Sequence, residues 1–152
     1  MRQVKEQIES ALGSGTVRAA WNNIRHEGGN CFAAAFWVAN AAKIAGYEPV
    51  LVHGSPTLAC APFGKYAHAW VEIAVPLEQV TGGKVVGFED EAFPLVVDYS
   101  NGLSAVLPTQ LYYSLGKIEP TSCRRYSLDA ARQQIAKRRH YGPYHRNSGR
   151  TI

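Results

Sequence analysis

The fold is decided by residues 28–42, which read GGNCFAAAFWVANAA. The two glycines and the asparagine favour a turn, and the alanine-rich run that follows strongly favours a helix. Because this run is apolar almost all round, we expect a buried helix from about Cys31 to Ala45. Gly46 is the natural residue to end it, since glycine adopts the left-handed conformation that closes many helices.

The segments that follow this helix have the composition of β-strands. We expect strands at 49–53, 68–75, 84–88 and 95–99, with a hairpin turn at 81–83. The strand at 68–75 has the strongest pattern of the four. A central helix followed by a run of strands predicts an α+β fold, in which the buried helix packs on an antiparallel sheet.

Helical segments are also expected before this core. Val4, Ile8 and Leu12 are spaced four residues apart, which predicts an amphipathic helix over residues 2–12. Residues 16–25 are expected to form a second short helix or a turn. The N-terminal part is therefore helical and supplies an apolar face that must be covered.

The C-terminal part is expected to be helical as well. Residues 108–115 are expected to be helical or irregular. Ser127 is a suitable N-cap for a helix that ends near Arg139, because its hydroxyl can accept a hydrogen bond from the first turn. The length suits one domain, which we expect over residues 1–140, followed by a basic tail over residues 141–152.

The composition is that of an ordinary globular protein. The chain has 152 residues, of which 46% are hydrophobic and 18% charged. No stretch approaches the roughly 20 apolar residues of a membrane span, so no membrane partner is expected. Residues 1–10 are charged and lack the apolar region of a secretory signal. Three cysteines far apart do not suggest a disulfide framework, so the expected compartment is the cytoplasm.

The net charge of +4 is unevenly distributed along the chain. Residues 1–120 carry a net charge of −3 and residues 121–152 one of +7. The candidate partner-binding cations of this basic segment are Arg124, Arg125, Arg138 and Arg139. Cations beside aromatic residues can bind nucleic-acid phosphates and bases, or they can hold an acidic protein. Such a segment is more often a solvated surface.

Three residues have the chemistry and the local setting of a nucleophile, a base and an orienting acid. Cys31 begins the expected helix, where unpaired N–H groups and the helix dipole favour the thiolate that attacks carbonyl carbon. His68, in AHAWVE, opens a strand and would exchange a proton with the thiol and the leaving group. Asp98, in VVDYSNG, closes another strand and would fix the imidazole tautomer.

An acyl-transfer site also needs donors for a developing oxyanion. The N–H group of Cys31 would supply one donor. Candidates for the second donor are amide and indole side chains before the nucleophile: Asn22, Asn23, Asn30 and Trp21. Trp70 is expected to pack beside the site, and Glu72 is expected on the same sheet face as His68.

Several of these side chains have alternative assignments. His53 also ends a strand and is an alternative base, although its Gly-Ser-Pro context favours a turn. Cys60 is a weaker alternative nucleophile because no helix follows it, and Cys123 is expected to be incidental. A zinc site formed by Cys31, Cys60, His53 and His68 would match no familiar ligand spacing, so no metal and no cofactor are expected.

Taken together, a cysteine at a helix start, His-Ala-Trp-Val-Glu on a strand and Asp-Tyr-Ser-Asn-Gly after a strand resemble the transglutaminase-like superfamily of cysteine proteases and acyltransferases. The resemblance covers roughly residues 28–102, and it extends to the leader-peptide-cleaving proteins of lasso peptide maturation. It implies a papain-like fold, with Cys31, His68 and Asp98 as a triad that acts on amide bonds through an acyl-thioester.

The chain also departs from this family. Three alanines follow Cys31, where the family often has a polar or charged residue. A calcium-site signature is absent from the sequence, and there is no room for the β-domains of animal transglutaminases. Hydrolysis or deamidation is therefore expected in preference to cross-linking.

These observations predict a thiol hydrolase for a peptide or protein substrate. One alternative is a catalytically inactive papain-like module that binds nucleic acid or an acidic protein through the basic C-terminal segment. Another is an accessory protein that binds a peptide without forming an acyl-enzyme. The reactivity of Cys31 distinguishes the first hypothesis from the other two.

Overall fold

The computed structural model describes residues 1–24, 30–57, 66–88, 90–100 and 104–142. In chain order, its elements are α1 (Arg2–Leu12), α2 (Gly15–Ile24), α3 (Cys31–Ile44), β1 (Val50–Gly54), β2 (His68–Pro76), α4 (Leu77–Thr81), β3 (Ala92–Asp98), β4 (Ala105–Pro108), α5 (Thr109–Leu115), a 3-10 turn at Pro120–Ser122, β5 (Arg124–Ser127) and α6 (Leu128–Arg138). Within these described ranges, no helix has the length and apolar character needed to cross a membrane.

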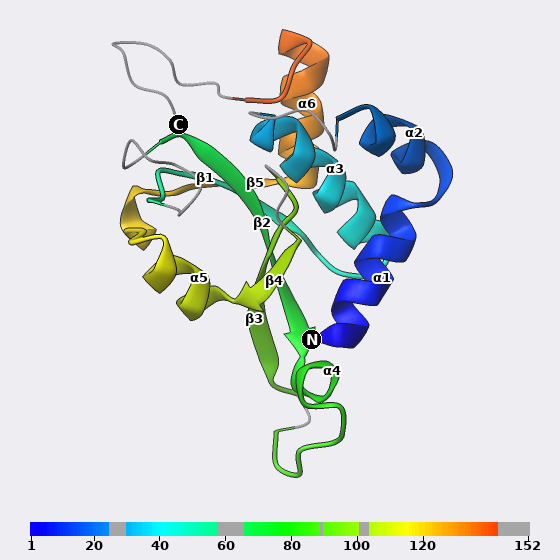
Figure 1. Ribbon diagram of the computed structural model, residues 1–152, viewed down its shortest axis with the longest axis vertical. Helices are drawn as coiled ribbons and strands as arrows, with labels where there is room; N and C mark the ends of the chain where they lie inside the picture. Colours follow the sequence, from blue (N-terminus) through cyan, green and yellow to red (C-terminus); the bar gives the residue numbers. More distant parts are fainter. Residues whose placement is uncertain (25–29, 58–65, 89, 101–103, 143–152) are drawn as a thin grey trace.

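The expected α+β class is confirmed. The strands form one antiparallel sheet in the order β4-β3-β2-β1-β5, so the strongest predicted strand, β2, lies at its centre. Helices α1, α3 and α6 lie on one side of the sheet and α5 on the other (Figure 1).

Alternation along β2 divides the core into two parts. Ala69, Val71, Ile73 and Val75 belong to the large cluster that includes the buried residues of α1 and α3. Trp70 faces the opposite way and packs with Tyr112 and Tyr113 of α5 in a smaller cluster. Adjacent strand residues point to opposite faces, so every even-numbered position from His68 to Glu72 lies on the side of α5.

The buried helix α3 begins and ends close to where the sequence predicts. It starts at Cys31 and ends at Ile44, with Gly46 in the left-handed conformation at φ +96°. The Gly46 N–H donates to the Lys43 carbonyl, and the Tyr47 N–H donates to the Ala42 carbonyl at 2.9 Å. This pair of bonds is the Schellman arrangement, which satisfies carbonyls at the helix end.

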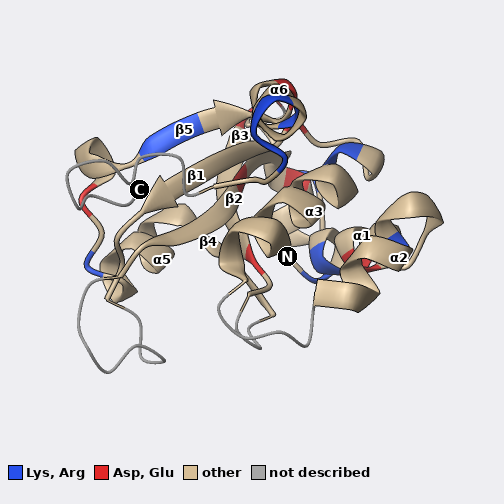
Figure 2. Ribbon diagram, turned by 90° about the horizontal axis from the view of Figure 1, so that it is seen from above, with Lys and Arg blue, Asp and Glu red and all other residues tan. Residues whose placement is uncertain are grey.

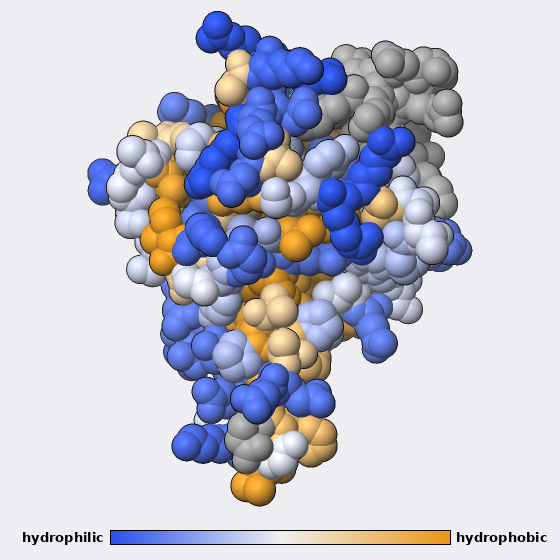
Figure 3. All heavy atoms as spheres, turned by 180° about the vertical axis from the view of Figure 1, so that it is seen from behind, coloured by the Kyte–Doolittle hydropathy of each residue, from blue (hydrophilic) through white to orange (hydrophobic). Residues whose placement is uncertain are grey.

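The predictions of a strand at 84–88 and of a hairpin turn at 81–83 are wrong. Residues 77–81 form the short helix α4, which Gly82 ends in the left-handed conformation at φ +82°. The chain then turns back, and the Phe88 N–H donates to the Val85 carbonyl. Val86 and Phe88 are exposed, so their preference for β-structure is not supported by packing against a core. Figure 3 shows hydrophobic atoms protruding at the lower end of the molecule.

The C-terminal region contains two short strands that the sequence did not predict. Strands β4 and β5 have four residues each and lie at the two edges of the sheet. Helix α5 resolves the ambiguity at 108–115, and helix α6 begins as expected. The Ser127 hydroxyl accepts a hydrogen bond from the Ala130 N–H at 3.1 Å, which confirms Ser127 as an N-cap.

The end of the described chain is part of the core. Tyr141, expected at the start of the tail, is buried, and its hydroxyl lies 2.5 Å from His53 Nε2. A side chain at Gly142 would collide with Phe32, the residue after Cys31. The expected turn at residues 28–29, the alternative nucleophile Cys60, the turn at residues 101–102 and the tail from residue 143 lie outside the described residues.

Candidate active site

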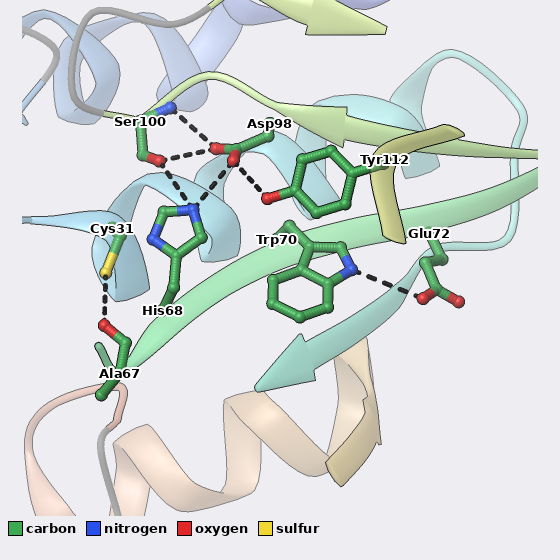
Figure 4. A network of polar contacts seen from close by, with 8 residues as sticks. All are labelled: Cys31, Ala67, His68, Trp70, Glu72, Asp98, Ser100 and Tyr112. Atoms are coloured by element: carbon green, nitrogen blue, oxygen red, sulfur yellow. Dashed lines mark hydrogen bonds and ion pairs between the residues drawn. The ribbon is translucent and has the colours of Figure 1, made fainter. Parts of the chain in front are cut away.

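Cys31, His68 and Asp98 are brought together at one end of the sheet (Figure 4). Cys31 is the first residue of α3, His68 the first of β2 and Asp98 the last of β3. Because β2 and β3 are antiparallel, the start of one strand lies beside the end of the other. All three residues are buried, with exposed fractions of 5%, 0% and 2%.

The buried imidazole of His68 is held by the carboxylate of Asp98. His68 Nε2 lies 2.8 Å from Asp98 Oδ2, at the distance of a charge-assisted hydrogen bond. An ionised carboxylate only accepts hydrogen bonds, so the proton on Nε2 is directed to it. The other ring nitrogen, Nδ1, is thereby left to interact with a second group.

The group beside Nδ1 is the thiol of Cys31. Figure 4 shows the sulfur next to the imidazole on the side of Nδ1, and Cys31 Sγ lies 4.0 Å from the carbonyl oxygen of Ala67. Among the described residues, His68 Nδ1 has no hydrogen-bond partner. The atom is therefore available to exchange a proton with the sulfur.

The environment of His68 favours its protonated form. Burial has the largest influence and by itself lowers the pKa, because it disfavours charge. The hydrogen bond and charge of Asp98, together with the interaction with Cys31, outweigh burial and raise the pKa of His68 to about 9. An imidazolium beside a thiol stabilises the thiolate, which is the nucleophilic form.

Asp98 accepts hydrogen bonds from four groups. Its Oδ1 receives the N–H of Ser100 at 3.1 Å and the Ser100 hydroxyl at 2.6 Å. Its Oδ2 receives the Tyr112 hydroxyl at 2.7 Å in addition to His68. Burial raises the pKa of Asp98, but these donors outweigh it, and the pKa is lowered below its ordinary value.

Sequence reasoning did not assign roles to Ser100 and Tyr112. The Asp-x-Ser spacing was a usable signal for Ser100, since an aspartate often accepts hydrogen bonds from the residue two positions later. Ser100 also lies beside His68, with its hydroxyl oxygen 3.4 Å from Nε2. No local pattern points to Tyr112, which reaches Asp98 from α5.

Trp70 supports His68 from within the core. Its ring stacks on the imidazole with centroids 6.1 Å apart and an interplanar angle of 29°. Because Trp70 is fully buried, it does not line an open cleft. Glu72 lies on the same sheet face, as expected, and accepts hydrogen bonds from the Trp70 indole at 3.4 Å and from the Tyr113 hydroxyl.

The candidate oxyanion donors lie on two different parts of the fold. Asn30 directly precedes α3 as its N-cap residue, without a capping bond from its side chain. Asn22 and Asn23 are exposed on α2, and Trp21 of the same helix is half-buried against Tyr99. The first backbone hydrogen bond of α3 runs from the Ala34 N–H to the Asn30 carbonyl at 2.9 Å. The N–H groups of Cys31, Phe32 and Ala33 come before it and have no acceptor within the helix. The identity of the second donor stays a prediction.

His53 does not share the site of His68. The two residues pair with Ala69 and Gly54 in the β1–β2 ladder, so their side chains point to opposite faces of the sheet. His53 packs against Phe32 and Tyr126 with centroids 4.9 and 4.8 Å away. Within the described part of the chain, no group of three or more His, Cys, Asp or Glu side chains is arranged so that it could hold a metal ion; Cys60 lies outside this part.

The four candidate arginines do not form one surface. Arg125 donates to the Tyr113 hydroxyl at 2.8 Å and pairs with Glu72 at 3.4 Å, so it is part of a local network. Arg124 is beside it on β5, whereas Arg138 and Arg139 lie at the far end of α6. Figure 2 shows the cations of β5 and of α6 in two separate places.

Comparisons of the chain with protein-family models, with curated proteins and with solved structures find no match. Inference about function therefore depends on the geometry of the site and on the resemblance of its residues to a family pattern.

Proposed function

We propose that this protein is a thiol hydrolase that acts on amide bonds, with Cys31 as nucleophile, His68 as proton carrier and Asp98 as orienting acid. The observation that carries the proposal is the position of His68 between a carboxylate and a thiol. Its Nε2 is 2.8 Å from Asp98, and the Nδ1 side of its ring faces Cys31 at the start of a helix. This order of groups is what nucleophilic catalysis requires.

In the first half of the reaction, the Cys31 thiolate attacks the amide carbonyl carbon and forms a carbon–sulfur bond. The carbonyl electron pair moves to oxygen, where the N–H groups at the start of α3 can stabilise the charge. When the tetrahedral intermediate collapses, the carbon–nitrogen bond breaks, and His68 gives its Nδ1 proton to the leaving amine. The products are a free amine and an acyl-thioester on Cys31.

In the second half, a water molecule attacks the thioester. Neutral His68 takes a proton from that water, and the carbon–sulfur bond breaks to release a carboxylic acid. The thiolate and the imidazolium are thereby restored. His68 keeps its Nε2 proton throughout and donates it in a hydrogen bond to Asp98, whose charge stabilises each imidazolium that forms.

We further propose that the fold is a papain-like or transglutaminase-like core. Its support is the arrangement that the resemblance implies: a buried helix with the nucleophile at its N-terminus, packed on an antiparallel sheet that carries the base and the acid. The proposed substrate is a peptide or a protein, and the proposed acceptor is water.

Two probes test the proposal on the full chain. Iodoacetamide at neutral pH, followed by peptide mapping, compares the alkylation rates of the cysteines. p-Nitrophenyl acetate tests for an acyl-enzyme through a burst of nitrophenolate. Cys31→Ser keeps the shape of the site and removes the thiol, and Cys123→Ser is the matched control because this free cysteine is far along the chain and half-buried.

We expect Cys31 to react faster than Cys123, and we expect the burst to disappear in Cys31→Ser but persist in Cys123→Ser. Equal alkylation rates, or a burst that survives in Cys31→Ser, would overturn the proposal. Cys123 is a suitable reference because burial, as the largest influence, raises the pKa of its thiol.

A further inference from the structure

Tyr112 is the one residue of α5 that hydrogen-bonds to Asp98. Its hydroxyl donates to Oδ2 at 2.7 Å, and the same oxygen accepts the His68 Nε2 proton at 2.8 Å. Two donors therefore share one carboxylate oxygen. The Tyr112 ring is buried and packs on Trp70 with centroids 5.4 Å apart, so its hydroxyl is held in place by the core.

We propose that Tyr112 is a positioning residue that sets the basicity of His68 by competing with it for the Asp98 oxygen. This inference rests on the proposed function, because it concerns the same triad. A carboxylate oxygen that already receives a strong donor holds less negative charge for a second one. Asp98 consequently stabilises the imidazolium less than an otherwise unshared carboxylate would.

The Tyr112 hydroxyl is suited to this role because it stays protonated. Burial is the largest influence and raises the pKa of the phenol, and the adjacent charge of Asp98 raises it further. A neutral phenol beside a carboxylate can only donate to it. Tyr112 is thus a fixed donor over the pH range in which His68 titrates.

In the described part of the chain, few other polar groups lie around His68, so a shift in its pKa can be interpreted. Cys31 approaches from α3, Asp98 from β3, and Ser100 lies 3.4 Å from Nε2. The Tyr66 ring lies 5.3 Å from the imidazole. The Tyr112 hydroxyl is hydrogen-bonded to Asp98, so removing this hydroxyl should act on His68 through Asp98.

Tyr113→Phe provides a matched control on the same helix. The Tyr113 hydroxyl is also buried and also bound to a carboxylate, but it donates to Glu72 and accepts from Arg125. The control therefore removes an equivalent phenol hydroxyl from the same cluster without touching Asp98.

The experiment follows the His68 ring nitrogens by NMR during a pH titration of the full chain. In Tyr112→Phe, the pKa of His68 should rise by about 0.5 to 1 unit, because Asp98 loses a competing donor. Deacylation of the p-nitrophenyl acetate adduct near pH 7 should slow by roughly three- to tenfold, since the neutral fraction of the base falls accordingly. Tyr113→Phe should leave both measurements unchanged.

A second variant should shift the pKa of His68 in the opposite direction, and it keeps the Tyr112 hydroxyl. 3-Fluorotyrosine at Tyr112 is a stronger donor, and it should lower the pKa of His68. If neither variant moves the His68 titration relative to Tyr113→Phe, the inference is wrong. A wild-type chain that forms no acyl-enzyme would contradict the proposed function, whereas the NMR titration would still decide the role of Tyr112.

Discussion

His68 Nε2 and Asp98 Oδ2 lie 2.8 Å apart, and both side chains are almost completely removed from solvent. Neither charge would be stable alone at this depth, because water no longer solvates it. The pair is stable because each charge faces the other, and because Ser100 and Tyr112 satisfy the remaining capacity of the carboxylate. The stability of the fold is therefore linked to the protonation of this pair.

The first prediction is a loss of stability in mildly alkaline solution. The pKa of His68 is about 9 in the folded chain and about 6.5 when unfolded, so its contribution is complete below pH 6.5. It is lost as the pH rises through 9, and the free energy of unfolding should fall on the order of 1–3 kcal/mol. Guanidinium unfolding at several pH values between 6 and 9.5 measures this change.

His68→Gln is the control for that measurement, because glutamine does not titrate. Its free energy of unfolding should vary less over the same pH interval. Asp98 does not interfere, since its lowered pKa means that its contribution is lost only in acid, as the pH falls through the folded value. A wild-type curve as flat as that of His68→Gln would contradict the assignment of a protonated His68.

The second prediction concerns Asp98→Asn. The amide has no negative charge, so the pKa of His68 should fall, and the acyl-transfer rate should drop by roughly a thousandfold or more. The amide nitrogen also turns a donor toward the Ser100 or Tyr112 hydroxyl, which costs about 1–3 kcal/mol of stability. Burst kinetics and guanidinium unfolding measure the two effects; an active variant would exclude an essential orienting role.

The third prediction concerns Gly54, which faces the indole that supports His68. A Cβ atom at this position would lie 2.5 Å from Trp70 Cη2 and 3.0 Å from Cys123 Sγ. Gly54→Ala should therefore destabilise the fold by about 1–3 kcal/mol through overpacking. Gly83→Ala is the matched control, since its Cβ would meet nothing within 4 Å. Equal thermal unfolding midpoints for the two variants would contradict the packing described here.

The fourth prediction distinguishes the proposed catalytic activity from nucleic-acid binding by the C-terminal arginines. Arg138→Gln combined with Arg139→Gln should leave the nitrophenolate burst unchanged, because both side chains are exposed, whereas Cys31, His68 and Asp98 are buried. Binding of a fluorescent single-stranded oligonucleotide should be weak and lost near about 0.15 M salt, where exposed charges are largely screened. Salt-resistant binding that this double variant abolishes would instead support the binding-module alternative.

The sequence was informative wherever a pattern was local. The run of alanines and the closing glycine predicted α3 to within a residue, and the apolar stretch after His68 predicted β2. The edge strands β4 and β5 were missed because four residues carry too little periodicity. The strand predicted at residues 84–88 is wrong because its apolar residues project from a loop and are exposed.

The candidate site was predictable in part, because some of its residues lie in recognisable local patterns. Cys31, His68 and Asp98 are each recognisable from neighbouring residues, such as a helix start or a strand end. Tyr112 and the packing of Trp70 depend on tertiary contacts between β2, β3 and α5, which leave no mark on the local sequence. The separation of His53 from His68 follows only from the strand register.

The location of the triad on three separate elements has a consequence for biosynthesis. The sulfur and its base are 37 positions apart in the chain, and the carboxylate follows 30 positions later, so none can meet until α3, β2 and β3 have assembled. A nascent or partly folded chain thus carries an ordinary cysteine. The proposed nucleophile, base and acid can therefore act together only when the tertiary structure of these three elements is complete.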